Sequence, residues 1–478
     1  MIISRKSEIK RLKQAYLSKE AELIVIYGRR RVGKTFLIRS LFEAENCRFL
    51  VCTGSKKGLL KAQLKHFAEA VTKTFTAGIN VKVPESWDEA FKLLTLLIEQ
   101  NQNEKVVIFL DELPWLASRK SGVLDSLDYY WNQYWSRNPK IKLIACGSSA
   151  SWLIKKIIYN KGGLHNRCTC ELKLDPFTLA EVDEYLVSRN IKLNKKHVLE
   201  LYMAPGGIPY YLKYVEKGLS AHENTQNILF SKQAPLKDEF KKLFDSLFSN
   251  AKAYIELVQL IAQRKEGLSR TLLEVQSKKS SGGGRLSGRL NQLKQTNFIE
   301  SYVSWNKEKG EYYKVIDEFS IFYLSWFQTS KSGHFTEDHW LKQTVKAQYE
   351  TWSGYAFEAI CHKHVNQIIN ALNLKTAEKI SSWRHFPKEN NDKGAQIDLL
   401  IDRSDDAITL CEIKYTDKPF VVTRQYAANI MQKEQCFKDQ TKTNKHLFNA
   451  LISANGIKQN QYSLTAFDNV VTLEDLFK

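Results

Sequence analysis

The chain has 478 residues, which is too long for one hydrophobic core, so we expect roughly three domains. Its 43% hydrophobic content is typical of globular domains. No apolar run reaches the roughly 18–20 residues that a membrane-spanning helix needs, and the charged start of the chain argues against a secretory signal. We therefore expect a cytoplasmic protein without a membrane partner, whose eight scattered cysteines are reduced thiols.

The charge balance is strongly basic. A formal net charge of +19, with a pI near 9.3, favours polyanionic partners, of which DNA is the natural candidate. The alternative is an even spread of solvated lysines, which would carry no information about partners. Charge alone does not separate these two interpretations.

A phosphate-binding loop stands near the start of the chain. The apolar run 22–27 predicts a buried parallel strand, and 36–42 has helical spacing. Between them, Gly28-Arg-Arg-Arg-Val-Gly-Lys-Thr35 matches GxxxxGK[ST] in full. The glycines let successive amides point at phosphate oxygens, Lys34 reaches the β and γ phosphates, and Thr35 is a ligand for Mg²⁺. The residues expected to contact ATP here are Gly28, Arg29, Arg30, Arg31, Val32, Gly33, Lys34, Thr35 and Phe36.

A carboxylate pair follows a second buried strand, predicted over 105–110. Asp111 at the strand tip is expected to hold Mg²⁺, and Glu112 to polarise the attacking water. A further strand over 48–52 lies between the two motifs, with helices near 58–74 and 87–101. This insertion resembles the additional-strand branch of P-loop NTPases. We therefore expect that the two motif strands are not neighbours, unlike in kinases and GTPases.

Two more strands complete the expected sheet. The run 142–147 ends in hydroxyl residues, so Ser148 is a candidate sensor of the γ-phosphate, with an ordinary glycine–serine loop as the alternative. A fifth strand is expected over 169–174.

Several motifs together resemble the archaeal-type ATPases of the AAA+/STAND group. They are the phosphate loop, Leu110-Asp-Glu-Leu-Pro-Trp115, Gly147-Ser-Ser149, Leu174-Asp-Pro-Phe-Thr-Leu-Ala-Glu181 and Gly206-Gly-Ile-Pro-Tyr-Tyr-Leu212. The resemblance implies that Arg167 is an arginine that senses or stabilises the γ-phosphate, in its own subunit or a neighbour. It also implies that Pro209 lies in a helical lid near the nucleotide. Ser4 departs from the family, which often has glycine at this position.

Residues 251–316 have the order of a winged helix: helices over 251–263, 269–275 and 285–295, then strands over 298–303 and 311–316. A loop at 280–284 precedes the third helix. In that helix Leu286, Leu290 and Leu293 form an apolar stripe. An opposing stripe is suited to phosphates or base edges, and its members are Arg285, Gly288, Arg289 and Gln292. The alternative is that this module packs against the ATPase and relays its nucleotide state.

The last 140 residues contain a second set of charged residues. A helix begins at 352 and carries Glu358. Strands are expected over 396–402 and 408–414, joined by a turn at 403–406. A hairpin centred near Asp405 places Asp398 opposite Glu412, and Lys414 shares the face of Glu412.

Two opposed carboxylates favour a shared Mg²⁺ or Mn²⁺, and a nearby lysine can orient water or offset charge on phosphate. The arrangement resembles the PD-(D/E)xK nuclease fold. The resemblance implies Glu358 as the helical acid, Asp398 and Glu412 as metal ligands, and Lys414 as the catalytic lysine. Such folds also persist as inactive binding modules. His362 and His364 are two apart on a helix, so they face different ways and do not indicate zinc.

The sequence thus predicts an α/β chain in three parts: a P-loop ATPase with a parallel sheet and helical lid (1–230), a winged helix (231–334) and a restriction-endonuclease-like domain (335–478). We expect ATP and Mg²⁺ as cofactors, and a nucleotide state that controls the DNA-interacting and nuclease-like parts. The alternative is a STAND-like signalling switch with a C-terminal domain that only binds. Pathway, DNA preference and oligomeric state stay open.

Overall fold

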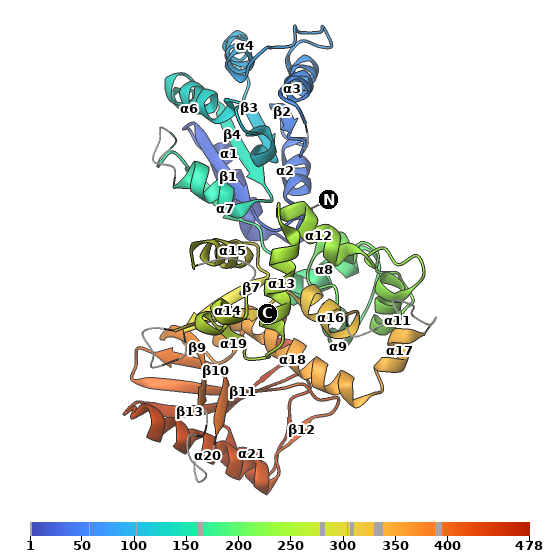
Figure 1. The fold of residues 1–478 in the computed structure, drawn as a ribbon, viewed down its shortest axis with the longest axis vertical. Coiled ribbons are helices and arrows are strands. Elements are labelled where there is room, and N and C mark those ends of the chain that lie inside the picture. The colour runs from blue at the N-terminus through green and yellow to red at the C-terminus, as the bar shows by residue number, and fades with distance from the viewer. Residues whose placement is uncertain are drawn as a thin grey trace. The chain divides into compact units, whose positions relative to one another are not determined.

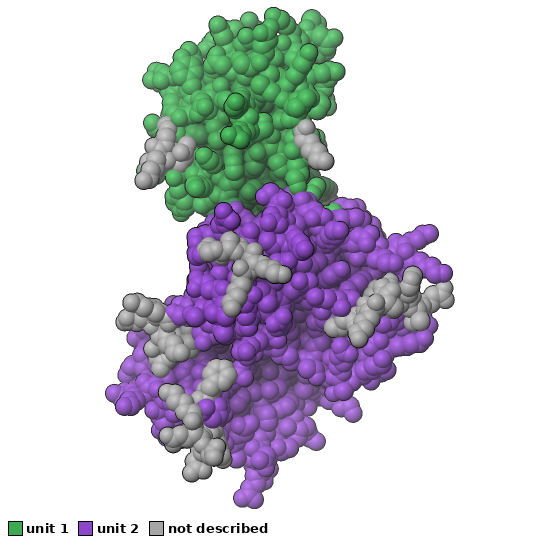
Figure 2. Space-filling view, in the orientation of Figure 1, with its two compact units in different colours: residues 1–176 green, residues 177–478 purple. Residues whose placement is uncertain are grey.

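The structure is a computed structural model that describes residues 2–56, 58–101, 103–159, 164, 166–277, 283–303, 305, 310–328, 338–385, 387 and 394–478. The chain forms two compact units, residues 1–176 and 177–478 (Figure 2). The predicted domain boundaries near 230 and 334 both fall inside the second unit and remain predictions. Within the described ranges, no helix is long and apolar enough to cross a membrane.

The first unit contains a five-stranded parallel sheet with the order β2-β3-β4-β1-β5 (Figure 1). Its strands are β1 Glu22–Tyr27, β2 Arg48–Thr53, β3 Val106–Asp111, β4 Ile141–Gly147 and β5 Cys170–Lys173. β4 lies between β1 and β3, so the expectation that the two motif strands are not neighbours is confirmed. The inserted strand β2 does not separate them; it forms the edge beyond β3, because chain order does not set spatial order in a parallel sheet.

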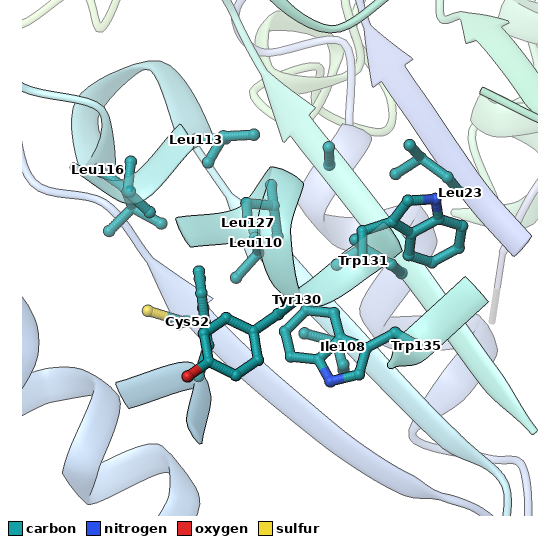
Figure 3. Close-up of a cluster of buried hydrophobic side chains, with 14 of the residues drawn as sticks. Leu23, Cys52, Ile108, Leu110, Leu113, Leu116, Leu127, Tyr130, Trp131 and Trp135 are labelled. Atoms are coloured by element: carbon teal, nitrogen blue, oxygen red, sulfur yellow. The ribbon is translucent and has the colours of Figure 1, made fainter. Parts of the chain in front are cut away.

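Helices accompany this sheet, and buried aromatic side chains fill the core on one of its faces. Every residue of β1, β3 and β4 is buried, which explains why these strands are continuous apolar runs. Tyr130, Trp131 and Trp135 pack with strand residues such as Ile108 and Leu110 (Figure 3). The helices are α1 Lys6–Leu17, α2 Lys34–Phe42, α3 Leu60–Phe75, α4 Trp87–Gln100, α5 Leu113–Leu116, α6 Val123–Gln133 and α7 Ala150–Leu153, with short helical segments η1 Trp135–Arg137 and η2 Ile154–Ile158.

The second unit begins with a helical region. Its first helix starts at a capping box, in which Thr178 and Glu181 each bond the other's backbone amide. A side chain at Gly207 would stand 2.0 Å from the carbonyl oxygen of Phe177, so glycine is required there. The helices are α8 Leu179–Ser188, α9 Lys195–Tyr202, α10 Pro209–Leu212, α11 Ala221–Thr225, η3 Gln226–Phe230 and α12 Glu239–Leu247.

A three-stranded antiparallel sheet and three helices follow in the order expected of a winged helix. The elements are α13 Ala251–Ala262, β6 Leu268–Ser269, α14 Arg270–Gln276, α15 Gly283–Gln295, β7 Ile299–Val303 and β8 Glu311–Val315. The sheet order is β6-β8-β7. The apolar stripe Leu286, Leu290 and Leu293 is buried, as predicted. Part of the predicted 280–284 loop lies outside the described residues, and Gly283 already belongs to α15.

The C-terminal region has a five-stranded mixed sheet with the order β15-β13-β11-β10-β9. Strands β9 to β11 are antiparallel, whereas β11, β13 and β15 are parallel. The β10–β11 hairpin pairs Leu399 with Cys411, which confirms the predicted register. The elements are α16 Glu318–Trp326, α17 His339–Gln343, α18 Ala347–Lys363, α19 Val365–Ala371, β9 Ala377–His385, β10 Ala395–Arg403, β11 Ala407–Lys414, β12 Phe420–Val421, α20 Arg424–Thr441, β13 His446–Ser453, β14 Ile457–Lys458, α21 Gln461–Ala466, β15 Asn469–Thr472 and α22 Leu473–Leu476.

A buried histidine joins the first helix of this unit to α18. The backbone amide of Leu179, in the first turn of α8, donates to Nε2 of His364 at 3.0 Å. The other ring nitrogen of His364, Nδ1, lies 2.8 Å from the Ile360 carbonyl oxygen, to which it donates. Nε2 must therefore be unprotonated, and burial lowers the pKa of His364 from 6.5 to about 4.

This lowered pKa predicts acid sensitivity. The unfolded state takes up the proton more readily than the folded state, so the stabilisation is complete above pH 6.5 and is lost as the pH falls from 6.5 towards 4. We expect that His364→Gln makes the dependence of unfolding free energy on pH shallower by up to about 1.4 kcal/mol per pH unit. Urea unfolding at pH 7, 6, 5 and 4.5 measures this slope. An identical slope in wild type and variant would contradict the assignment.

Candidate functional site

Parallel pairing brings the predicted nucleotide residues to one edge of the first sheet. β1, β3 and β4 run in the same direction, so their carboxyl ends meet at that edge. The phosphate loop follows β1, Asp111 ends β3, and Ser148 follows β4. The structure therefore brings together Lys34, Thr35, Asp111, Glu112 and Ser148.

Lys34 is folded back onto its own loop. Its ammonium donates to the carbonyl oxygens of Gly28 at 2.9 Å and Arg29 at 3.0 Å, and the side chain is buried. These neutral acceptors are weaker partners than phosphate oxygens. A triphosphate in the loop can therefore take over the ammonium without leaving a buried group unpaired.

Thr35 and Asp111 form the second part of this site. The Thr35 hydroxyl lies 3.0 Å and 3.2 Å from the two carboxylate oxygens of Asp111. Burial and the neighbouring Glu112 raise the pKa of Asp111, although Thr35 and Lys34 act in the opposite direction. A hydroxyl and a carboxylate at one buried point are hard oxygen donors, and a cation there would favour the ionised carboxylate. This donor set fits Mg²⁺.

Glu112 is held by the end of β4. One of its carboxylate oxygens accepts both the backbone amide and the hydroxyl of Ser148, each at 3.0 Å. Glu112 has a φ of 47°, which is uncommon for a residue other than glycine. Ser148 thus contacts the catalytic candidate itself. Its predicted role as a γ-phosphate sensor stays a prediction.

The arginines of the loop differ in their surroundings. Arg29 is only 1% exposed. The Arg30 guanidinium lies 6.0 Å from the ring centroid of Trp115, which follows the carboxylate pair. Phe36 is exposed at the start of α2, and Val32 is buried.

Arg167 lies elsewhere. It is exposed and precedes β5, whose start pairs with the start of β1, so it stands at the amino-terminal edge of the sheet. The phosphate loop is at the opposite edge, and the structure does not bring Arg167 together with Lys34. An action on a neighbouring subunit remains a prediction. Pro209 begins α10 in the second unit, and its relation to the nucleotide also remains a prediction.

The backbone at the start of the chain shows why glycine suits position 4, where this chain has Ser4. Ser4 and Arg5 both have a φ of 61°, the left-handed region in which glycine is at ease. The guanidinium of Arg5 donates to the carbonyl oxygens of Asp175, at 2.6 Å, and Val32, at 3.4 Å. The arginine therefore ties the chain start to the phosphate loop and to the segment after β5.

The second predicted site also assembles. Lys414 lies 2.8 Å from a carboxylate oxygen of Glu412. Asp398 accepts the backbone amide of Ile413 at 3.0 Å. Burial, together with the charges of Glu412 and Glu358, raises the pKa of Asp398 to about 7. Burial alone would raise the pKa of Glu412, but the nearby lysines outweigh burial and lower it. The pKa values of these two neighbouring carboxylates are thus shifted in opposite directions.

Three partners in this site were not predicted. Lys433 and the Tyr426 hydroxyl, both on α20, lie 2.7 Å and 2.9 Å from the carboxylate oxygens of Glu412. Lys314 of β8 lies 2.7 Å from Glu358. Sequence motifs did not identify them because α20 and β8 reach the site only through packing. Across the described part of the chain, no group of three or more His, Cys, Asp or Glu side chains is arranged to hold a metal.

The histidine pair is explained without a metal. Nε2 of His362 lies 3.2 Å from the carbonyl oxygen of Asp398, and His364 contacts α8. The two rings therefore have separate partners, which agrees with the expectation that they do not form a zinc site.

The proposed nucleic-acid face of α15 is only partly exposed. Arg285 and Gly288 are exposed. The Arg289 guanidinium instead lies 5.9 Å from the ring centroid of Tyr254, and the Tyr254 hydroxyl donates to Gln292. Half of the predicted stripe therefore turns toward α13.

Comparison with known proteins identifies the class of the first site. Residues 2–215 match the model of a family described as an ATPase domain predominantly from Archaea. The matched residues include the phosphate loop and the Thr35–Asp111 contact, so this part of the chain is similar to an archaeal-type P-loop ATPase domain. Residues 327–430 match a second family, described as archaeal and bacterial proteins of unknown function.

Two proteins of Methanocaldococcus jannaschii are similar to this chain. Uncharacterized protein MJECL04 is 28% identical over 425 residues, which cover 87% of this chain and 88% of that protein. Uncharacterized ATP-binding protein MJ0423 is 46% identical over 43 residues, which cover 9% of this chain and 73% of that protein.

Solved structures that are similar to this chain include the Walker-type ATPase PABY2304 of Pyrococcus abyssi. It is 20% identical in sequence with a TM-score of 0.47, and the match covers 67% of this chain and 95% of that chain. The Aeropyrum pernix ORC2 protein is 13% identical with a TM-score of 0.46, and the match covers 76% of this chain and 96% of that chain.

The phosphate loop predicts contrasting glycine substitutions. A side chain at Gly28 would stand 2.2 Å from the carbonyl oxygen of Leu174, whereas one at Gly33 would meet no atom within 4 Å. Gly33 has a φ of 93°, so Gly33→Ala should cost only backbone strain, about 1–2 kcal/mol. We expect Gly28→Ala to lower the melting temperature of the nucleotide-free protein further, because two backbones must separate. Equal melting temperatures would contradict this packing.

Proposed function

We propose that this chain binds and hydrolyses ATP at the edge formed by β1, β3 and β4. The observation that carries the proposal is the contact between Thr35 and Asp111 beside Lys34, with Glu112 next in the chain. The match of residues 2–215 to an ATPase domain supports it. The name of the relative MJ0423, an ATP-binding protein, is consistent with it.

The residues have distinct roles in this proposal. The loop amides and the Lys34 ammonium bind phosphate oxygens and neutralise charge that develops during transfer. Thr35 and Asp111 hold Mg²⁺, which when bound offsets the charge of the triphosphate. Glu112 accepts a proton from the attacking water, for which its carboxylate must turn from Ser148 toward the phosphate. Until nucleotide binds, Ser148 engages one of the two carboxylate oxygens of Glu112.

Two substitutions separate binding from chemistry. Lys34→Ala removes a charge-assisted phosphate contact and should weaken ATP binding by about 10- to 100-fold. Glu112→Gln should leave ATP binding nearly unchanged and slow turnover by roughly 10²–10⁴-fold. Equilibrium binding of a fluorescent ATP analogue and phosphate release measure the two effects. Arg39→Ala, which breaks only the exposed Arg39–Glu43 pair on α2, is the control. Unchanged binding and turnover in Lys34→Ala would refute the proposal.

A second activity, Mg²⁺- or Mn²⁺-dependent DNA cleavage, is proposed for the C-terminal site. The specific observation in its favour is that Glu412, Glu358 and Lys414 are all close enough for their charges to shift the pKa of Asp398. The nuclease resemblance requires these four side chains to lie near one another. Asp398 and Glu412 supply hard oxygen donors, and Lys414 is near enough to offset charge on a phosphate. These residues fit the metal by chemistry. In this structure ion pairs occupy the oxygens of Glu412, and hydrogen bonds from Gln396 and Ile413 occupy those of Asp398.

The winged-helix order of α13 to β8 supports DNA contact by this part of the chain, with Arg285 as an exposed cation on α15. Because Arg289 and Gln292 face Tyr254, we assign DNA positioning to the first turn of α15. Contacts with phosphates there would add affinity without sequence preference.

Control by the nucleotide would pass through α18. Lys363 of α18 lies 2.7 Å from Glu318 of α16, and both are largely buried. A side chain at Gly206, in the Gly-x-Pro segment of the lid, would stand 2.8 Å from the same Glu318 carboxylate. His364 joins α18 to α8 as well. A lid that moves must therefore move α18, which carries Glu358.

One experiment separates this machine from a STAND-like signalling switch. We expect duplex, single-stranded or branched DNA to stimulate ATP turnover, and Asp398→Ala to abolish cleavage in Mg²⁺ or Mn²⁺ while ATP turnover persists. Slow turnover that is indifferent to DNA, without cleavage of any of these substrates, would favour the switch. The C-terminal domain would then only bind.

A further inference from the structure

The wing strands β7 and β8 lie over the C-terminal acidic site. Between them and the strands β9 and β10 is a cavity of about 330 Å³. Tyr302 and Tyr312 line it from the wing, with their rings stacked 5.6 Å apart. Glu358 and Asp398 line it from the C-terminal side. Two of the three proposed catalytic carboxylates thus line a space that the wing helps to form.

Lys314 of β8 supplies the only ammonium among the residues that line this cavity. Its nitrogen lies 2.7 Å from Glu358, and its side chain is 6% exposed, against 18% for Glu358. Burial by itself would lower the pKa of Lys314, but the charge and hydrogen bond of Glu358, together with Tyr355 and Glu300, outweigh burial and raise it. The lysine is therefore a cation fixed on one of the acids that the nuclease-like site needs.

Two further contacts fasten the wing to the C-terminal sheet. The indole nitrogen of Trp305 donates to Asp402 at 3.0 Å, and its ring lies 5.1 Å from that of Phe437. Arg384 of β9 lies 2.9 Å from Glu266, just before β6. Trp305 contacts none of the four predicted catalytic residues in these interactions, so it holds the wing without belonging to the site.

From these contacts we propose that the wing is an autoinhibitory cover, in which Lys314 occupies Glu358 in place of a divalent cation. The proposal rests on the nuclease-like function proposed above. While the wing is closed, a second cation beside Asp398 would meet the Lys314 ammonium and find Glu358 already paired. The acids become available to a metal when the wing, and Lys314 with it, withdraws.

Metal binding by the full chain without nucleotide tests this cover directly. The probe is Mn²⁺, and its affinity is measured by isothermal titration calorimetry and by the electron paramagnetic resonance signal of free Mn²⁺. Lys314→Met removes the charge but keeps the length of the side chain, and should tighten Mn²⁺ binding at least about tenfold. The double variant Lys314→Met/Glu358→Gln should lose that gain.

Two control variants and one independent variant accompany the Mn²⁺ titration of Lys314→Met. Lys314→Arg keeps the cation and should bind Mn²⁺ as the wild type does. Lys294→Met breaks the Lys294–Glu311 pair, which also joins a lysine to β8 but does not line the cavity, and should likewise have no effect. Trp305→Ala loosens the wing while Lys314 and Glu358 stay intact, and should tighten Mn²⁺ binding in the same direction. Wild-type rates of ATP hydrolysis in each variant would verify that the first unit is intact. An unchanged circular dichroism spectrum would verify that the second unit is folded.

The outcomes separate the two proposals. Wild-type Mn²⁺ affinity in both Lys314→Met and Trp305→Ala overturns the cover, whether or not the protein cleaves DNA. Tighter Mn²⁺ binding without cleavage supports the cover and refutes the nuclease activity. Tighter binding together with faster cleavage supports both.

Discussion

The first site depends on the relative register of three buried parallel strands. Tyr27 of β1 pairs with Gly147 of β4, and Leu110 of β3 pairs with Ala145, so the three strand ends fall in one row. A slip of one residue would displace Asp111 by about 3.3 Å, which exceeds the tolerance of its hydrogen bonds with Thr35. Because both faces of these strands are buried in apolar side chains, the register is held by packing far from the chemistry.

The two sites handle charge in opposite ways. The phosphate loop offers a cation and backbone amides to an anionic ligand. In this structure the Lys34 ammonium donates hydrogen bonds to neutral carbonyl oxygens instead. In the C-terminal site carboxylates are gathered, and lysines from three separate elements neutralise them: Lys314 of β8, Lys414 of β11 and Lys433 of α20. These lysines are paired with carboxylates inside the second unit. Because the net charge of +19 already subtracts Asp and Glu, these pairs leave that figure unchanged.

One helix, α18, connects these features within the second unit. Glu358 lies on its cavity side, Lys363 pairs with the buried Glu318, and His364 at its end receives the first amide of α8. Breaking either buried polar contact would leave an uncompensated group, which costs more than the contact contributes. The helix thus joins the lid region to the acidic site, and the proposed control by the lid and the proposed cover by the wing would act through residues attached to it or facing it.

The sequence by itself determined the local chemistry of this protein. The phosphate loop, the carboxylate pair after β3 and the β10–β11 hairpin are each continuous in the chain. The motif pattern was therefore enough to predict Thr35 and Asp111 as ligands of one Mg²⁺, and turn geometry the register of Asp398 and Glu412. The helical stripe of α15 was equally local. The tertiary structure alone decided which strand separates β1 from β3, that Arg167 stands at the far edge of the sheet, and that Arg289 turns toward Tyr254. It also decided that Lys314, Lys433 and Tyr426 reach the acids. These contacts join residues that are distant in the chain, and only the packing of whole elements, which no local pattern encodes, brings them together.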